Sequence, residues 1–130
     1  MAKLHDVVFD CPHPASLARF WADAMDDYQV APYDEAELAR LRSEGIEDPE
    51  DDPMVIVEAG PNVRPRMLFQ LVPEPKTVKN RVHLDLTCAD LHTETARLVA
   101  LGAEVLAEHD GWVTLTDPAG NEFCVFATQD

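Results

Sequence analysis

Two segments of this chain carry nearly the same pattern, and this repetition limits the possible fold more than any other feature. The run Asp6-Val7-Val8-Phe9-Asp10-Cys11 precedes one amphipathic segment, and His83-Leu84-Asp85-Leu86-Thr87-Cys88 precedes another in the second half. The two runs align without a gap when Cys11 is placed on Cys88. A strand–helix unit that occurs twice predicts a pseudo-symmetric fold with a site between its halves.

The spacing of apolar residues predicts the element order β-α-β-(insert)-β-β, followed by β-α-β-β-β. We place the first module at residues 3–72 with an insert at 34–53, a linker at 73–80 and the second module at 81–127. Each half is expected to be one helix on one face of a short, antiparallel-dominated sheet, which is an α+β arrangement within a single domain, 1–130. The two curled half-barrel sheets should then surround a shared cleft, with both helices outside.

Composition excludes several classes of partner. The chain has 130 residues, and its 25 acidic against 10 basic side chains give a net charge of −15, which argues against nucleic-acid and anionic-membrane partners. No apolar run approaches the roughly 20 residues of a transmembrane helix. The three cysteines show no CxxC spacing, and an odd number of thiols in strand-like segments indicates a reducing, cytoplasmic location.

Several motifs resemble the vicinal oxygen chelate superfamily, the glyoxalase and bleomycin-resistance-like proteins. They are Phe20-Trp21 on the first predicted helix, Leu101-Gly102-Ala103 at the end of the second, and the C-terminal stretch from Trp112 through Asp117-Pro118-Ala119-Gly120-Asn121 to Phe123. The segment 79–86 is similar to the glyoxalase-like subgroup. The resemblance covers nearly the whole chain, and the insert at 34–53 is its least typical part.

The resemblance also implies where a divalent metal would bind. Metal-dependent members use four inward-facing side chains, and the matching positions here are Asp6, Gln70, His83 and Cys124. Gln70 and Cys124 stand where carboxylates are expected, and a neutral amide oxygen is a poor ligand for zinc, nickel or iron(II). We therefore predict no tightly bound metal and no other cofactor, although a divalent metal is possible.

The same four residues are our candidates for ligand binding, with Phe69 and Trp112 as apolar walls of the cleft. Each candidate also has a structural alternative. These alternatives are a hydrogen bond across the sheet for His83, a salt bridge for Asp6, and core packing for Cys124, Phe69 and Trp112.

Two functions of different classes are compatible with this pattern. The first is a metal-independent protein that binds a small organic molecule in the cleft between the modules. The second is an enzyme of the lyase, isomerase or dioxygenase type that acts on a small oxygen-rich substrate, with a metal or with Asp6 and His83 as acid and base. The sequence lacks nucleotide-binding and nucleophile-elbow motifs. Because curled half-sheets leave uncovered edges, we also expect a homodimer.

Overall fold

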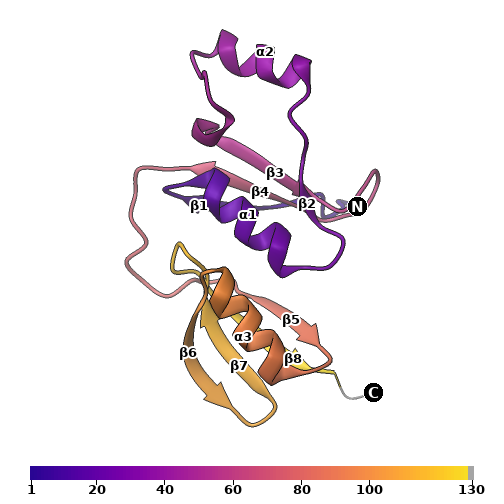
Figure 1. Ribbon diagram of the computed structural model, residues 1–130, viewed down its shortest axis with the longest axis vertical. Helices are drawn as coiled ribbons and strands as arrows, with labels where there is room; N and C mark the ends of the chain where they lie inside the picture. Colours follow the sequence, from indigo (N-terminus) through magenta and orange to yellow (C-terminus); the bar gives the residue numbers. More distant parts are fainter. Residues whose placement is uncertain (129–130) are drawn as a thin grey trace. The chain divides into compact units, whose positions relative to one another are not determined.

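The computed structural model describes residues 1–128 and shows two units, Met1–Pro75 and a second that begins at Lys76 (Figure 1). Each unit contains one four-stranded mixed sheet, and neither sheet closes into a barrel. The α+β fold expected from the sequence is confirmed. The boundary between the units falls inside the segment 73–80.

The first unit places its strands in the order β1-β4-β3-β2. Strand β1 is parallel to β4, and the other two pairings are antiparallel. Its elements are β1 (Asp6–Cys11), α1 (Pro14–Ala24), β2 (Gln29–Val30), α2 (Glu35–Ser43), the short 3₁₀ helix η1 (Pro49–Asp51), β3 (Met54–Glu58) and β4 (Arg66–Leu71).

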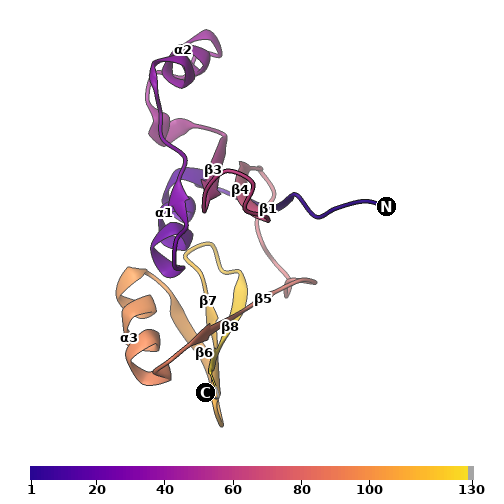
Figure 2. The ribbon, with the colours of Figure 1, turned by 90° about the vertical axis from the view of Figure 1, so that its right-hand side faces the viewer.

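Helix α1 covers one face of this sheet (Figure 2). Pro14 starts the helix at a position where its missing N–H costs no hydrogen bond. Phe20 and Trp21 of this helix are both buried. Trp21 stacks on Phe9 with ring centroids 5.8 Å apart, and Phe9 stacks on Phe69 at 5.2 Å. These stacked rings connect α1 to strands β1 and β4.

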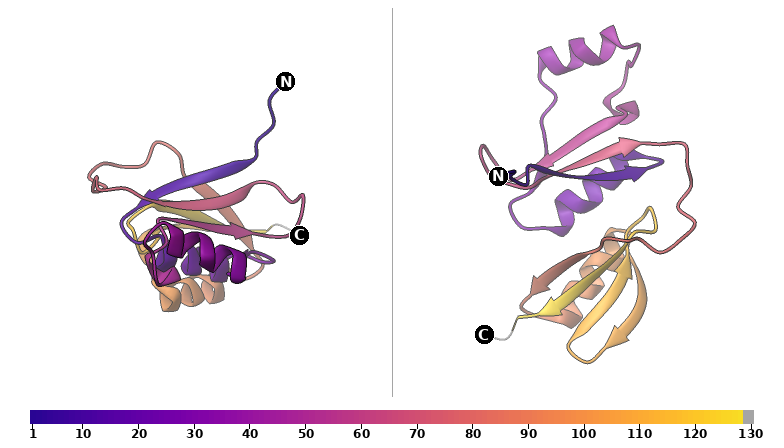
Figure 3. Two further views of the ribbon diagram at one scale, coloured as in Figure 1. Left: turned by 90° about the horizontal axis from the view of Figure 1, so that it is seen from above. Right: turned by 180° about the vertical axis from the view of Figure 1, so that it is seen from behind.

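Helix α2 belongs to the insert and lies apart from the strands of its unit (Figure 3). Asp34 caps its start, since the carboxylate accepts a hydrogen bond from the Glu37 N–H at 2.9 Å. The helix ends at Ser43, because Gly45 takes a left-handed conformation (φ 82°) and the Ile46 N–H donates a hydrogen bond to the Leu41 carbonyl. Leu41 is the one buried residue of α2.

The second unit repeats the plan, with strand order β5-β8-β7-β6 and one parallel pair, β5 with β8. Its helix α3 begins after the N-cap Asp90 and stops at Gly102, whose φ of 124° suits glycine. The elements are β5 (Leu84–Cys88), α3 (Leu91–Leu101), β6 (Glu104–His109), β7 (Trp112–Thr116) and β8 (Glu122–Ala127). Across residues 1–128, no helix is long and apolar enough to span a membrane.

The hairpin between β7 and β8 is held by a buried carboxylate. Asp117 is 3% exposed, and its Oδ1 accepts hydrogen bonds from the N–H groups of Ala119 and Asn121, each at 2.9 Å. The Asn121 side-chain amide adds two more bonds to Asp117. This Asp-Pro-Ala-Gly-Asn turn sets the register of β7 and β8, and therefore the row of side chains described next.

Candidate functional site

The side chains of the second sheet alternate between a face covered by α3 and a face that no helix of this unit covers. Leu115, Phe123 and Val125 point to the covered side and are buried. Asp85, Cys124 and Thr114 occupy the other side, and they pair directly in register across β5, β8 and β7. We refer to this row and the side chains around it as the open face of the second sheet.

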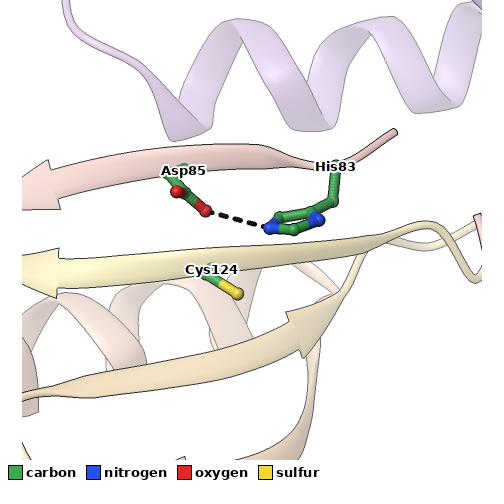
Figure 4. A group of neighbouring side chains, drawn as sticks. All are labelled: His83, Asp85 and Cys124. Carbon is green, nitrogen blue, oxygen red and sulfur yellow. Dashed lines mark ion pairs between the residues drawn. The ribbon is translucent and has the colours of Figure 1, made fainter. Parts of the chain in front are cut away.

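His83, Asp85 and Cys124 form a cluster on the open face, which we call the His83 cluster (Figure 4). One ring nitrogen of His83, one carboxylate oxygen of Asp85 and the Cys124 Sγ all lie within 4.8 Å of one another. The His83 Nε2 is 3.2 Å from the Asp85 Oδ1. The side chains of His83 and Asp85 are 44% and 57% exposed, whereas Cys124 is buried beneath them. Solvent therefore reaches the imidazole and the carboxylate directly.

Three aromatic rings continue the open face next to the cluster. His109 stacks on Trp112 with centroids 3.7 Å apart, and Trp112 stacks on Phe126 at 5.2 Å. Thr114 connects these rings to the cluster, because its Oγ1 lies 3.2 Å from His109 Nε2 and 3.6 Å from Cys124 Sγ. The open face therefore combines exposed polar groups with a stacked aromatic surface.

The first unit holds the two other predicted ligand residues, and both already have partners within it. Arg66 donates two hydrogen bonds to the Asp6 carboxylate, at 2.8 and 3.1 Å. These bonds lower the pKa of Asp6 to about 2 against the opposing effect of desolvation, with a smaller contribution from His5. The Gln70 amide donates to Asp10 at 3.2 Å. The salt-bridge alternative considered for Asp6 is therefore present in the structure.

Phe69 lies on the opposite face of the first sheet from Gln70. Its side chain is fully buried and stacks on Phe9, beneath α1. Consecutive residues of a strand point to opposite faces, so the two cannot both line one surface. Of the two roles considered for Phe69, the structure shows core packing. Trp112, in contrast, lies on the open face and is only partly buried.

Glu122 anchors the segment that precedes β5. Its carboxylate accepts a hydrogen bond from Lys76 Nζ at 2.9 Å and another from the Asn80 N–H at 3.0 Å. Burial alone would raise the pKa of Glu122, but these donors outweigh it and hold the pKa at about 2. The anchor fixes the chain a few residues before His83 against the same strand that carries Cys124.

Comparison with known proteins identifies the family. The family model described as a glyoxalase-like domain matches residues 6–126. The chain belongs to the glyoxalase-like domain family. No functionally curated protein matches it.

Solved structures of the glyoxalase/bleomycin resistance/dioxygenase superfamily share this fold. A family enzyme from Burkholderia phytofirmans PsJN has a TM-score of 0.64 at 15% identity, over 97% of this chain and 98% of that chain. The fosfomycin resistance protein FosX from Mesorhizobium loti gives 0.65 at 12%, over 97% and 91%. The trypanothione-dependent glyoxalase I of Leishmania major gives 0.62 at 11%, over 98% and 87%. At these identities the similarity shows the fold alone.

Metal binding in this glyoxalase-like protein can be judged from the donors that the structure brings together. Zinc accepts imidazole nitrogen, carboxylate oxygen and thiolate sulfur, and catalytic zinc sites use three protein ligands with one open position. The donor types of the His83 cluster are ones that zinc accepts. Donors around tetrahedral zinc lie about 3.5 Å apart, so the three donor atoms, now within 4.8 Å of one another, would have to move slightly closer together. In the first unit, the Arg66 guanidinium beside Asp6 opposes a cation at that carboxylate.

Sequence reasoning missed Asp85, His109 and Arg66. Asp85 and His83 are two residues apart on an extended segment, and this alternation is the signal that would have placed them together. Arg66 is paired directly with Asp6 in the register of β1 and β4, which cannot be known without the sheet order. His109 reaches the open face because the β6–β7 hairpin pairs it with Trp112.

Proposed function

We propose that this glyoxalase-like protein binds a small, oxygen-containing organic molecule on the open face of its second sheet. The observation that carries the proposal is the exposed His83–Asp85 pair on the same face as the stacked rings of Trp112 and Phe126. Small-molecule sites generally combine an apolar or aromatic surface with a few placed polar groups. In this site the aromatic stack would hold the flat or apolar part of the molecule.

The polar part of the molecule would be oriented by the His83 cluster. Neutral imidazole can donate from one nitrogen and accept at the other, and the Asp85 carboxylate accepts only, so together they suit a hydroxyl or an enol beside a carbonyl. Thr114 supplies a hydroxyl that can donate or accept at the boundary between the cluster and the rings. A small planar molecule with oxygen atoms on neighbouring carbons would match this arrangement of polar and aromatic side chains.

We propose that this binding needs no metal. His83 Nε2 is directed at Asp85, and the two first-unit residues at the family's ligand positions are held by Arg66 and Asp10. A metal bound at Asp6, Gln70 or His83 would have to replace one of these interactions. The cysteines are present as thiols, which suits the reducing compartment that we propose for the protein.

A second candidate is a metal-dependent enzyme of the same superfamily, of the lyase, isomerase or dioxygenase type. The observation in its favour is the grouping of three donors within 4.8 Å. His83, Asp85 and Cys124 would hold a zinc ion, and bound zinc supplies a Lewis acid that polarises a carbonyl oxygen. In that case Cys124 would lose its proton on binding and Trp112 would still position the organic part of the substrate.

The test compares metal content and binding in one set of variants. Purified protein is analysed for zinc, nickel, iron and manganese, and is titrated with catechol and with pyruvate while amide shifts are followed by NMR. We expect less than stoichiometric metal and shifts centred on residues 83–85 and 112–114 that disappear in His83→Ala. His92→Ala, an exposed histidine at the start of α3, is the matched control. One zinc per chain that His83→Ala removes would support the enzyme instead.

A further inference from the structure

The first unit contains a cavity, which lies on the side of its sheet that carries α1. Its volume is about 280 Å³, close to the lower limit of small-molecule sites. Helix α1, strands β2 and β3 and the insert all contribute to its wall. The lining residues are Ala15, Arg19, Val30, Tyr33, Asp48, Pro49, Glu50 and Val55.

Most charged groups of this cavity are paired with each other. The Arg19 guanidinium donates two hydrogen bonds of 2.8 Å to the two carboxylate oxygens of Glu50, which joins α1 to η1. This pairing lowers the pKa of Glu50 and keeps both groups charged. The positive charge of Arg19 is thereby offset, and Asp48 is left as the uncompensated charge of the lining. Asp48 Oδ1 accepts from the Glu50 N–H at 2.9 Å, so the other carboxylate oxygen remains able to accept.

The hydroxyl of Tyr33 is already hydrogen-bonded, so the ring is the part of this lining residue that can contact a ligand. The hydroxyl donates to Asp52 Oδ2 at 2.7 Å, and Asp52 is 3% exposed and also accepts from the Met54 N–H. Burial together with this bond raises the pKa of Tyr33, so the phenol stays neutral. An aromatic face beside a carboxylate favours a cation over a neutral or anionic group.

We propose that this cavity binds a small primary ammonium compound with a short apolar or aromatic body. The ammonium would bind Asp48 and lie near the ring of Tyr33, and the body would pack on Ala15, Val30 and Val55. The net charge of −15 attracts cations to the whole chain, which adds to this local preference. The lining residues all belong to the first unit, and this inference goes beyond the proposed function.

The experiment uses benzylammonium as the probe, with benzyl alcohol and benzoate as neutral and anionic counterparts of similar shape. NMR titration should show benzylammonium binding with a dissociation constant on the order of 1 mM and at least about fivefold weaker binding of both counterparts. The shifts should map to α1, β2 and residues 48–50. Benzoate could bind only by displacing Glu50 from Arg19. If benzoate bound as tightly as benzylammonium, the proposal would be overturned. Equal binding of benzyl alcohol, or no binding of the ammonium at 20 times that concentration, would overturn it as well.

Two variants test the site itself. Asp48→Asn keeps an N-cap acceptor for η1 and removes the charge, and it should weaken benzylammonium binding about fivefold while thermal stability is unchanged. Asp34→Asn is the matched control, an N-cap of the same insert outside the lining, and it should bind like the parent. Val30→Phe fills the cavity and should abolish binding in a folded protein. Equal effects of Asp48→Asn and Asp34→Asn on benzylammonium binding would refute the site. Neither result would bear on catechol binding at the His83 cluster.

Discussion

Arg66 and Asp6 face each other across directly paired positions of β4 and β1, and two hydrogen bonds join the guanidinium to the carboxylate. The pKa of Asp6 falls to about 2 as a result. A carboxyl whose pKa is lower in the folded state stabilises the protein above its unfolded pKa of about 4, and this contribution is lost as the pH falls from about 4 to 2.

We therefore predict that Asp6→Asn reduces the pH dependence of the thermal unfolding midpoint between pH 4.5 and 2. Parent and variant should differ most at pH 5 and converge near pH 2. Asp10→Asn is the control, because Asp10 on the same strand accepts from the neutral Gln70 amide and not from a guanidinium. Parallel curves for parent and Asp6→Asn over this range would contradict the prediction.

His83→Ala should separate binding from stability. The imidazole is 44% exposed and its partner Asp85 is 57% exposed, so the free energy of unfolding should change by less than about 0.5 kcal/mol. Catechol affinity should fall about tenfold, the usual effect of losing one hydrogen bond in which a partner is charged. Denaturant unfolding and NMR titration measure the two quantities. A variant that unfolds several degrees lower with unchanged affinity would show that His83 is structural.

Phe69→Ala should have the opposite profile. Removing a fully buried phenylalanine leaves a cavity and costs about 3–5 kcal/mol. Phe126→Ala, at the end of the aromatic stack on the open face, should cost less, about 1–2 kcal/mol, because its ring is only partly buried. Urea unfolding of both variants provides the comparison. Greater destabilisation by Phe126→Ala would mean that the open face is part of the core.

Asp117→Ala should destabilise the β7–β8 hairpin by about 2–3 kcal/mol, because the part-buried N–H of Ala119 and the buried N–H of Asn121 lose their acceptor. Asp110→Ala changes an exposed aspartate in the other hairpin turn of the same unit, and it should stay within about 0.5 kcal/mol of the parent. Hydrogen exchange should show faster exchange along β8 in Asp117→Ala only. Unchanged exchange there would count against the role given to this turn.

We also predict a homodimer, since each sheet taken by itself ends in two edge strands, β1 and β2 in one and β5 and β6 in the other. Light scattering at tens of micromolar should give about twice the chain mass of 14.5 kDa. A monomer mass at that concentration would exclude this prediction.

The element order was predictable because periodicity, proline and glycine agree along most of the chain. The apolar spacing from Leu17 to Trp21 identifies α1, and Asp90 and Gly102 mark the two ends of α3. The second module was predicted to start at residue 81, but its first strand, β5, begins at Leu84, because the residues before it are irregular. Such a boundary depends on partner strands and cannot be read from local propensity.

The candidate site was less predictable than the fold. His83, Cys124 and Trp112 do lie on one face. Asp85 joins them through the pairing of β5 with β8, which are far apart in sequence, and His109 joins them through the β6–β7 hairpin. Phe69 and Gln70 were predicted to line the same cleft, but neighbouring residues of a strand point to opposite faces of the sheet. Tyr33 and Asp52 were not recognised at all, because their hydrogen bond depends on how the insert folds back.

The insert leaves and re-enters the first sheet at neighbouring points. Strands β2 and β3 pair antiparallel, with Val30 opposite Val57, and the Ala31 N–H bonds the Ile56 carbonyl at 2.9 Å. Residues 32–53 can therefore gain or lose length at a small entropic cost without changing the register of either strand. Evolution can thus reshape the ammonium cavity by insertion and deletion in this one segment, while the sheet that supports it keeps its sequence.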